Sequence, residues 1–165
     1  MDKIKFGGVF DVTCLNSTRQ VKWKSLAHNM VVDAGIQHIE DIIFTGAGGQ
    51  ITVWYAGVAN ESPAFASTDT SSSHGGWTMF TAYSEAAHQA WVETRSGNAL
   101  TNSASKAAFS INASGTAGGM YLISYATLTS TTGILLCGAS FTAGNQSVEN
   151  GDTLNVQYDF TGADA

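Results

Sequence analysis

Proline and charged residues are scarce in this chain of 165 residues. It has one proline, Pro63, and 12% charged residues, against about 25% in typical soluble domains. With 18 glycines and so little proline, most turns must be formed by Gly, Asn, Asp and Ser, which accept positive φ angles or bond to the local backbone. A weakly charged chain rich in Gly, Ser and Thr favours many short β-strands over a helical bundle.

Basic residues are also few, and most of them lie near the N-terminus. The chain has seven Lys and Arg and a net charge of -6, which argues against nucleic acid as a partner, because phosphate binding depends on those residues. Five of the seven are Lys3, Lys5, Arg19, Lys22 and Lys24. Two interpretations are open: a solvated edge strand whose lysines discourage aberrant pairing, or a docking patch for an acidic partner surface.

The chain has only two cysteines, Cys14 and Cys137, each inside an apolar run typical of a strand. We expect free buried thiols rather than a disulfide, since nothing marks the chain as secreted, and neither cysteine has the spacing of a metal site. The N-terminus lacks an apolar signal core, and no apolar run reaches membrane-spanning length. We therefore expect synthesis in the cytoplasm and no membrane partner.

The stretch Ser147–Phe160 carries the strongest structural pattern. The turn Asn150-Gly151-Asp152 precedes a strict alternation of apolar and polar residues, which predicts a half-buried strand. Its core face would hold Leu154, Val156, Tyr158 and Phe160, and its other face Asn155, Gln157 and Asp159. Residues 4–15, with a bulge expected at Gly7-Gly8, and residues 20–26 predict a hairpin within the first 26 residues.

One segment has helical spacing. From Asp33, a good N-cap residue, isoleucines recur at three- and four-residue intervals up to Ile43, and Gly46 follows as a stop signal. We predict one amphipathic helix over about 33–45, with its isoleucine stripe packed on a sheet.

Further strands are predicted at residues 51–58, 106–111, 119–128 and 134–141, and a long polar loop at residues 60–76. The whole chain, residues 1–165, fits one domain. The fold class we predict is mainly β: a single-domain β-sandwich of jelly-roll-like form with one amphipathic helix.

Catalytic and cofactor motifs are not found. There is no G-x-S-x-G sequence, and His28, His38, His74 and His88 lack the i, i+4 spacing of a helical zinc site. Glu85 and Glu93 could only form a glycosidase pair if the fold brought them together. The clusters Gly46–Gly49 and Gly115–Gly119 lack the Lys-Ser/Thr ending of a phosphate loop and are interpreted as turns. We predict no enzyme activity and no cofactor.

Six aromatic residues could form either part of the core or a platform that stacks on sugar rings: Trp54, Tyr55, Trp77, Phe80, Tyr83 and Trp91. Core packing is favoured for the set, because aromatic side chains dominate burial in a domain of this size. Trp77, which follows Gly75-Gly76 and the polar loop, is the member we expect to be exposed or at an interface.

Segments along nearly the whole chain resemble a family of small virion proteins of tailed bacteriophages, the head decoration or cement proteins. The matching stretches are Lys3–Val12 (K-I-K-F-G-G-V-F-D-V), Trp23–Gly35, Trp54–Val58, Gly75–Thr78, Ser103–Ile111 and the terminal V-E-N-G-D-T-L-N-V-Q-Y-D-F. The resemblance implies a β-rich, jelly-roll-like fold, a homotrimer, and binding to the outside of an icosahedral head.

Under this resemblance the partners are the major capsid protein and further copies of the chain, and the location is the surface of the virion after synthesis in the host bacterium. A trimer would hold neighbouring capsomers and gain avidity from its several copies. The candidate interface residues are Lys3, Lys5, Phe6, Arg19, Lys22, Trp23, Lys24 and Trp77, with Trp23 as the anchor. The alternative is a glycan-binding module of a head fibre or tail structure, using the Ser/Thr-rich loop and exposed aromatic rings.

Overall fold

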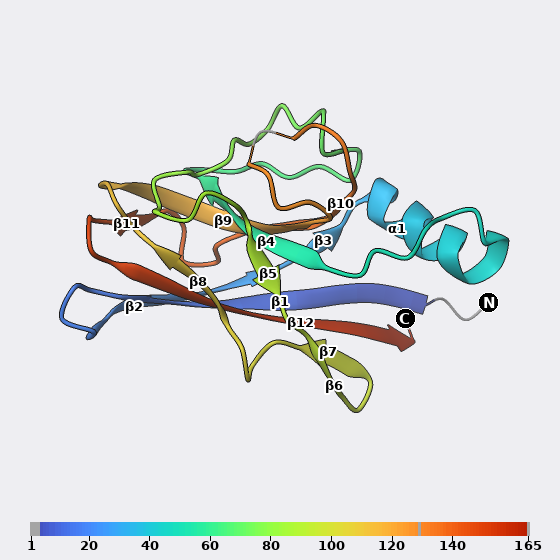
Figure 1. Ribbon diagram of the computed structural model, residues 1–165, viewed down its shortest axis with the longest axis horizontal. Helices are drawn as coiled ribbons and strands as arrows, with labels where there is room; N and C mark the ends of the chain where they lie inside the picture. Colours follow the sequence, from blue (N-terminus) through green and yellow to red (C-terminus); the bar gives the residue numbers. More distant parts are fainter. Residues whose placement is uncertain (1–3, 129, 165) are drawn as a thin grey trace.

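The computed structural model describes residues 4–128 and 130–164 and shows two antiparallel β-sheets packed face to face (Figure 1). Strands account for 48% of the chain and helix for 8%, which is consistent with a β-sandwich. The predicted fold class is confirmed.

The first sheet contains both ends of the described chain. Its strand order is β2 (Val21–His28), β1 (Ile4–Leu15), β12 (Thr153–Asp164), β7 (Ala99–Thr101) and β6 (Thr94–Ser96), and β8 (Ala107–Ser110) also pairs with β12. The long strands β1 and β12 pair along their whole length, from Ile4 opposite Asp164 to Leu15 opposite Thr153. This pair forms the centre of the sheet, and β2 and β6 form its edges.

The second sheet is built from the middle of the chain. Its order is β3 (Met30–Val31), β10 (Leu135–Ser140), β9 (Gly115–Ile123), β4 (Trp54–Asn60) and β5 (Gln89–Trp91), and β11 (Gln146–Val148) also pairs with β9. The short β3 directly follows β2, so the chain crosses from one sheet to the other at Asn29.

The alternation of the terminal strand is confirmed. Leu154, Val156 and Tyr158 are fully buried between the sheets, and Phe160 is half-buried near the end of the strand. Phe10, Val12 and Cys14 of β1 are buried beside them on the same face. Both cysteines are free and buried, as expected. Burial raises the pKa of the Cys14 thiol to about 12 and that of Cys137 to about 11.

The N-terminal hairpin of β1 and β2 is confirmed, but the bulge expected at Gly7-Gly8 is wrong. Pairing with β12 continues without a shift through both glycines, and the one irregularity of the β1–β2 register lies at Cys14–Leu15. Gly8 is required for a different reason: a Cβ there would overlap the Tyr158 ring and the Asp159 carbonyl oxygen.

The helix is shorter and differently oriented than predicted. An α-helix, α1 (Asp33–Glu40), continues into a single π-helical turn, η1 (Asp41–Thr45), and ends at Gly46 with a left-handed φ of 63°. Val32 occupies the N-cap position, so Asp33 is not the cap.

The isoleucine stripe packs only in part: Ile36 and Ile39 are half-buried and Ile39 contacts the core, whereas Ile42 and Ile43 are exposed. Gly35 and His38 are the buried residues of α1, because the helix backbone lies directly against Leu136 of β10. Ile42, Ile43 and Phe44 lie within the π turn itself and are exposed.

Two strand predictions need correction. Strand β4 begins at Trp54 rather than residue 51, and β9 runs from Gly115 to Ile123 rather than from 119 to 128. The Gly115–Gly119 cluster is therefore part of a strand, not a turn. Its small residues are needed there, since a Cβ on Gly118 would overlap Pro63 and Asn60, and one on Gly119 would overlap Ala139.

Candidate interaction surface

Trp77 is buried, so the prediction that it is exposed is wrong. Its side chain is 4% exposed, and its ring lies 4.1 Å from that of His74 and 4.8 Å from that of Tyr121, centroid to centroid. The indole Nε1 donates a hydrogen bond of 2.9 Å to the buried Asp69 carboxylate. Trp77 therefore fastens the long polar loop to the second sheet and presents no free ring face.

The other aromatic residues mostly confirm core packing. Phe80, Tyr83 and Trp91 are at most 4% exposed, and Trp54 and Tyr55 are half-buried. These rings do not form an exposed platform for sugars.

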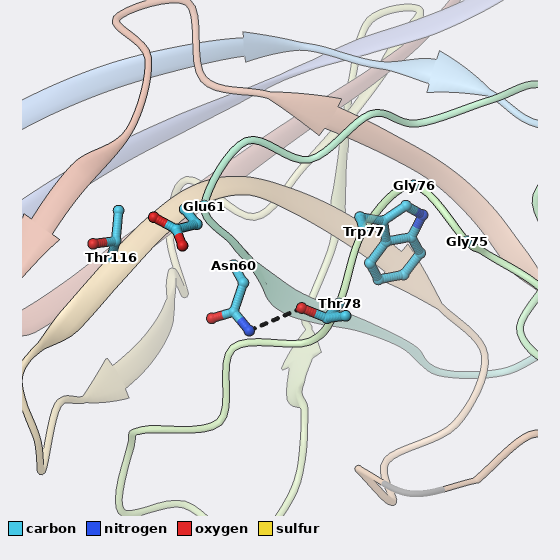
Figure 2. A pocket seen from close by; sticks show the side chains of 7 residues that line it. All are labelled: Asn60, Glu61, Gly75, Gly76, Trp77, Thr78 and Thr116. Carbon is cyan, nitrogen blue, oxygen red and sulfur yellow. Dashed lines mark hydrogen bonds between the residues drawn. The ribbon is translucent and has the colours of Figure 1, made fainter.

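A polar cleft of about 500 Å³ lies where the polar loop begins and ends (Figure 2). Asn60 and Glu61 line it from the start of the loop, and Gly75, Gly76 and Thr78 from its end. The Asn60 side-chain amide already donates a hydrogen bond of 2.9 Å to the Thr78 hydroxyl. Glu61 is exposed.

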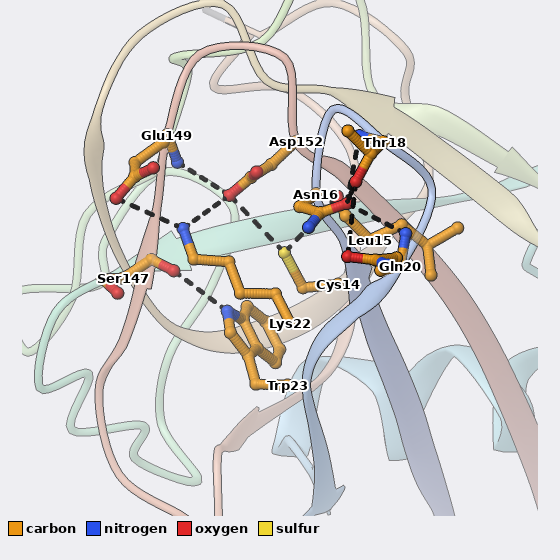
Figure 3. A network of polar contacts seen from close by, with 10 residues as sticks. All are labelled: Cys14, Leu15, Asn16, Thr18, Gln20, Lys22, Trp23, Ser147, Glu149 and Asp152. Carbon is orange, nitrogen blue, oxygen red and sulfur yellow. Dashed lines mark hydrogen bonds and ion pairs between the residues drawn. The ribbon is translucent and has the colours of Figure 1, made fainter.

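Lys22 has an internal role (Figure 3). Its Nζ lies 2.9 Å from Oδ2 of the buried Asp152 and 3.5 Å from Oε1 of Glu149. Partial burial opposes its charge, but the hydrogen bond and charge of Asp152 outweigh this effect and raise the pKa of Lys22. The candidate Lys22 is thus committed to holding the turn between β11 and β12.

Trp23 is also committed to the fold. Its Nε1 donates 2.9 Å to the Ser147 carbonyl oxygen, and its ring lies 5.8 Å from that of Phe141. The half-buried indole thus joins β2 to the second sheet.

The remaining basic candidates are exposed but do not form one patch. Arg19 lies in the β1–β2 turn and Lys24 on the edge strand β2, a position that suits both the edge-strand and the docking interpretation. Lys5 lies at the opposite end of β1, beside the half-buried Phe6. Lys3 lies outside the described residues. Neighbours in sequence are thus spread along the length of a hairpin.

Figure 1 shows that β1 begins, β12 ends and α1 lies at one end of the sandwich. Exposed apolar side chains from β1, β3, α1 and η1 gather there. We call this region the apolar end. Among the described residues, nine large apolar side chains are exposed. Ile4, Met30, Ile43 and Phe44 line a groove at this end and Ile42 lines a cavity beside it, with exposed fractions of up to 79% at Phe44.

An open groove of about 750 Å³ runs between β1 and the helix at this end. We call it the end groove. Ile4, Lys5 and Phe6 line one wall, and Ile39, Glu40 and Ile43 are among the residues of the other. Phe6 stacks on Phe160 of β12 with nearly parallel rings 6.1 Å apart. Lys5 and Phe6 are the two sequence candidates that the fold brings to this surface.

A smaller apolar cavity of about 230 Å³ lies on the other side of the helix, lined by Trp54, Trp91, Ile42 and His38 among others. His38 is only 7% exposed, and its Nε2 has no hydrogen-bond partner within the described part of the chain. Ile39 lines both this cavity and the end groove.

Sequence reasoning missed Ile43 and Phe44. The signal was present in the run Ile42-Ile43-Phe44, because three consecutive apolar residues on a helix spread around most of its circumference and cannot all face one sheet.

No protein-family model, curated protein or solved structure matches this chain. Within residues 4–128 and 130–164, no helix is long and apolar enough to span a bilayer. Over the same residues, no group of three His, Cys, Asp or Glu side chains is arranged to hold a metal ion.

Proposed function

We propose that this protein is a virion structural protein, a decoration or cement protein that binds the outside of an icosahedral phage head as a homotrimer. It adds no chemistry to the particle and stabilises the shell by binding only its assembled state. The proposal joins the resemblance of segments along the chain to one structural observation, the apolar end.

The apolar end supports an assembly role. Monomeric soluble proteins rarely expose large contiguous apolar surface, and such surface usually marks a site of protein association. Phe44 is 79% exposed and Ile43 60% exposed beside an open groove. Interfaces between permanently associated subunits are the most apolar class, so this end serves contact between copies.

The basic edge supports contact with the shell. We use this name for Arg19 and Lys24, which are exposed on the hairpin of β1 and β2. Arg19 lies near the end of β1 that is opposite the end groove. Three copies would present three such edges at once, and simultaneous attachment multiplies a weak affinity. The major capsid protein would supply acidic groups opposite them.

The glycan-binding alternative draws on the polar cleft of Figure 2. A sugar site there would have hydroxyl, amide and carboxylate groups from Thr78, Asn60 and Glu61. It would lack a stacking ring, because His74 and Tyr121 contact the Trp77 ring. Binding of the protein to glycans on an array would favour this function.

The deciding experiment is co-sedimentation of the protein with heads that lack it, followed by electron microscopy of the particles. We expect saturable binding that Lys24→Glu weakens at least about tenfold, while the matched charge reversal of exposed Lys106 leaves it unchanged. Glycan binding without head binding would overturn the proposal.

A further inference from the structure

Strand β1 has an open edge along the end groove. On the side away from β12, β2 pairs only with the part of β1 from Val9 to Leu15. At Gly8 the hydrogen-bonding partner on this side is Asn29. The Asn29 N–H donates a hydrogen bond of 3.0 Å to the Gly8 carbonyl oxygen, and the Asn29 side-chain oxygen accepts one from the Gly8 N–H. Beyond that point the chain crosses to β3, and on this side residues 4–7 are paired with no strand of the described chain.

The backbone groups on this edge can be identified. Successive residues of an antiparallel strand direct their N–H and C=O groups to alternate sides. Because both groups of Gly8 face Asn29, those of Phe6 and Ile4 face the same way, toward the end groove. An apolar groove that contains unpaired strand groups fits an incoming β-strand.

The same sheet has a second open edge at β6. Strands β6 and β7 form a hairpin whose two-residue turn, Gly97-Asn98, is flanked by the pair Ser96 and Ala99. Since the pair that closes such a turn is the hydrogen-bonded one, the backbone groups of Arg95 point away from β7. Thr94, Arg95 and Ser96 are all exposed.

We propose that the open edge of β1 in one copy pairs with β6 of the next copy, so that the first sheets of neighbouring subunits join edge to edge. The number of copies in this inference, three, rests on the proposed function. Each contact is heterologous, and contacts of that kind form a ring when the rotation between neighbouring copies closes, here after three copies.

Strand direction suits this pairing. Strands β1, β12, β7 and β6 are antiparallel to their neighbours in turn, so β6 runs opposite to β1 within one subunit. If neighbouring subunits are related by rotation about an axis parallel to the strands, each strand keeps its direction in every subunit. The contact between subunits is therefore antiparallel, like every pairing within the sheet.

Charge also fits the end groove. Arg95 lies opposite Leu100, and Leu100 lies opposite Phe160, which stacks on Phe6, so Arg95 and Phe6 belong to the same face of the sheet. If Phe6 pairs with Arg95 of the partner subunit, the guanidinium enters the groove beside the Phe6 ring. The opposite wall carries the exposed carboxylate of Glu40. A cation that meets both a ring and a carboxylate is well held.

The test is the mass of the full-length protein by analytical ultracentrifugation over a range of concentrations. We expect a trimer for the native sequence. Arg95→Glu and Glu40→Arg should each raise the dissociation constant at least about tenfold, because close interfacial charge pairs commonly contribute that much. The double variant, which restores opposite charges, should return to within about threefold of the native value.

Lys106→Glu, a charge reversal at another exposed lysine, is the matched control and should keep the native mass. A second variant, Arg95→Pro, removes the outward N–H without affecting the bonds to β7 and should also dissociate the trimer. Thermal unfolding would verify that each variant folds.

A native monomer, a dimer, single variants of native affinity, or a double variant that stays dissociated would each overturn this pairing. Head binding is measured separately. A trimer that shows the expected variant behaviour but does not bind heads would refute the decoration role and leave the pairing standing. A monomer that binds heads would refute the pairing and the homotrimer and leave the decoration role standing.

Discussion

At the scale of single residues, His88 is the buried titratable group with the clearest consequence for stability. It is 2% exposed, its Nε2 lies 2.7 Å from the Tyr121 hydroxyl, and its Nδ1 has no hydrogen-bond partner among the described residues. Burial lowers the pKa of His88. The folded protein therefore holds this imidazole neutral where an exposed one would begin to protonate.

We predict that the free energy of unfolding falls as the pH drops below about 6.5, the ordinary pKa of histidine. In this range the unfolded chain binds more protons at His88 than the folded chain does, so acid favours unfolding. Urea unfolding from about pH 8 to about pH 5 measures the effect. His88→Gln keeps a polar group near Tyr121 and should show a shallower loss. An equal slope in both proteins would contradict the assignment.

The two carboxylates around Lys22 should differ in their contribution to stability. Asp152 is buried, 2.9 Å from Nζ, and also accepts 2.9 Å from the Glu149 backbone N–H, while the Glu149 side chain is 70% exposed. We expect Asp152→Ala to cost about 2 to 3 kcal/mol and Glu149→Ala less than about 0.5 kcal/mol. Denaturant unfolding of the two variants measures these costs. Similar losses of unfolding free energy would show that the burial of Asp152 does not make its ion pair with Lys22 more stabilising than that of Glu149.

Trp77 and Lys22 show why side-chain roles were harder to predict than strands. The Gly75-Gly76 pair before Trp77 suggested exposure, but the partners that bury it include Tyr121, far along the chain. Lys22 looked like one member of a basic cluster, and its acidic partner is 130 residues away. Patterns within a few residues contain no record of such contacts.

At the scale of elements, the polar loop has no helix or strand from residue 61 to residue 76, after Asn60 ends β4, and is nevertheless fixed at several points. The Phe65 ring lies directly over Gly138 of β10, and the Ser140 hydroxyl donates 2.7 Å to the Pro63 carbonyl. Ser71 donates 2.7 Å to the Gly133 carbonyl. The loop is thus a fastened cover on the second sheet.

Gly138→Ala should loosen this cover, because its Cβ would overlap the Phe65 ring. We expect a cost of about 1 to 3 kcal/mol and faster proteolysis within the loop. Gly49→Ala is the matched control, since a Cβ at Gly49 meets nothing within 4 Å. The two measurements are the urea midpoint and the rate of limited proteolysis. Unchanged proteolysis in Gly138→Ala would mean that Phe65 does not hold the loop.

Strands could be predicted where apolar and polar side chains alternate. Strand boundaries could not be predicted where small residues pack closely against other backbone. The terminal strand could be predicted down to its buried face, because one face of the sheet meets the core and the other does not. Gly115–Gly119 has no such pattern, and its place inside β9 follows from the backbone that packs against it. The helix was located correctly, but its buried face depends on the close approach of Gly35 to β10.

At the scale of the whole molecule, the apolar end and the basic edge lie on different parts of the sandwich. The apolar end surrounds α1 and the start of β1, whereas Arg19 lies in the turn beyond the other end of that strand. The candidate site could be predicted only for Lys5 and Phe6, because its other walls come from α1, η1 and β3. Under the proposed function, this separation would let one surface contact further copies while the other contacts the shell.

The two contacts should respond differently to salt. Attachment through exposed basic side chains is screened as the Debye length falls from about 10 Å at 0.1 M to about 3 Å at 1 M, while strand pairing and apolar burial at the other end are screened far less. We expect head binding to weaken at least about tenfold over this range, with the trimer mass unchanged. Co-sedimentation and ultracentrifugation at matched salt concentrations measure the two separately. Lys24→Glu should flatten the salt dependence of head binding, and a parallel loss of trimer and attachment would mean that one surface serves both contacts.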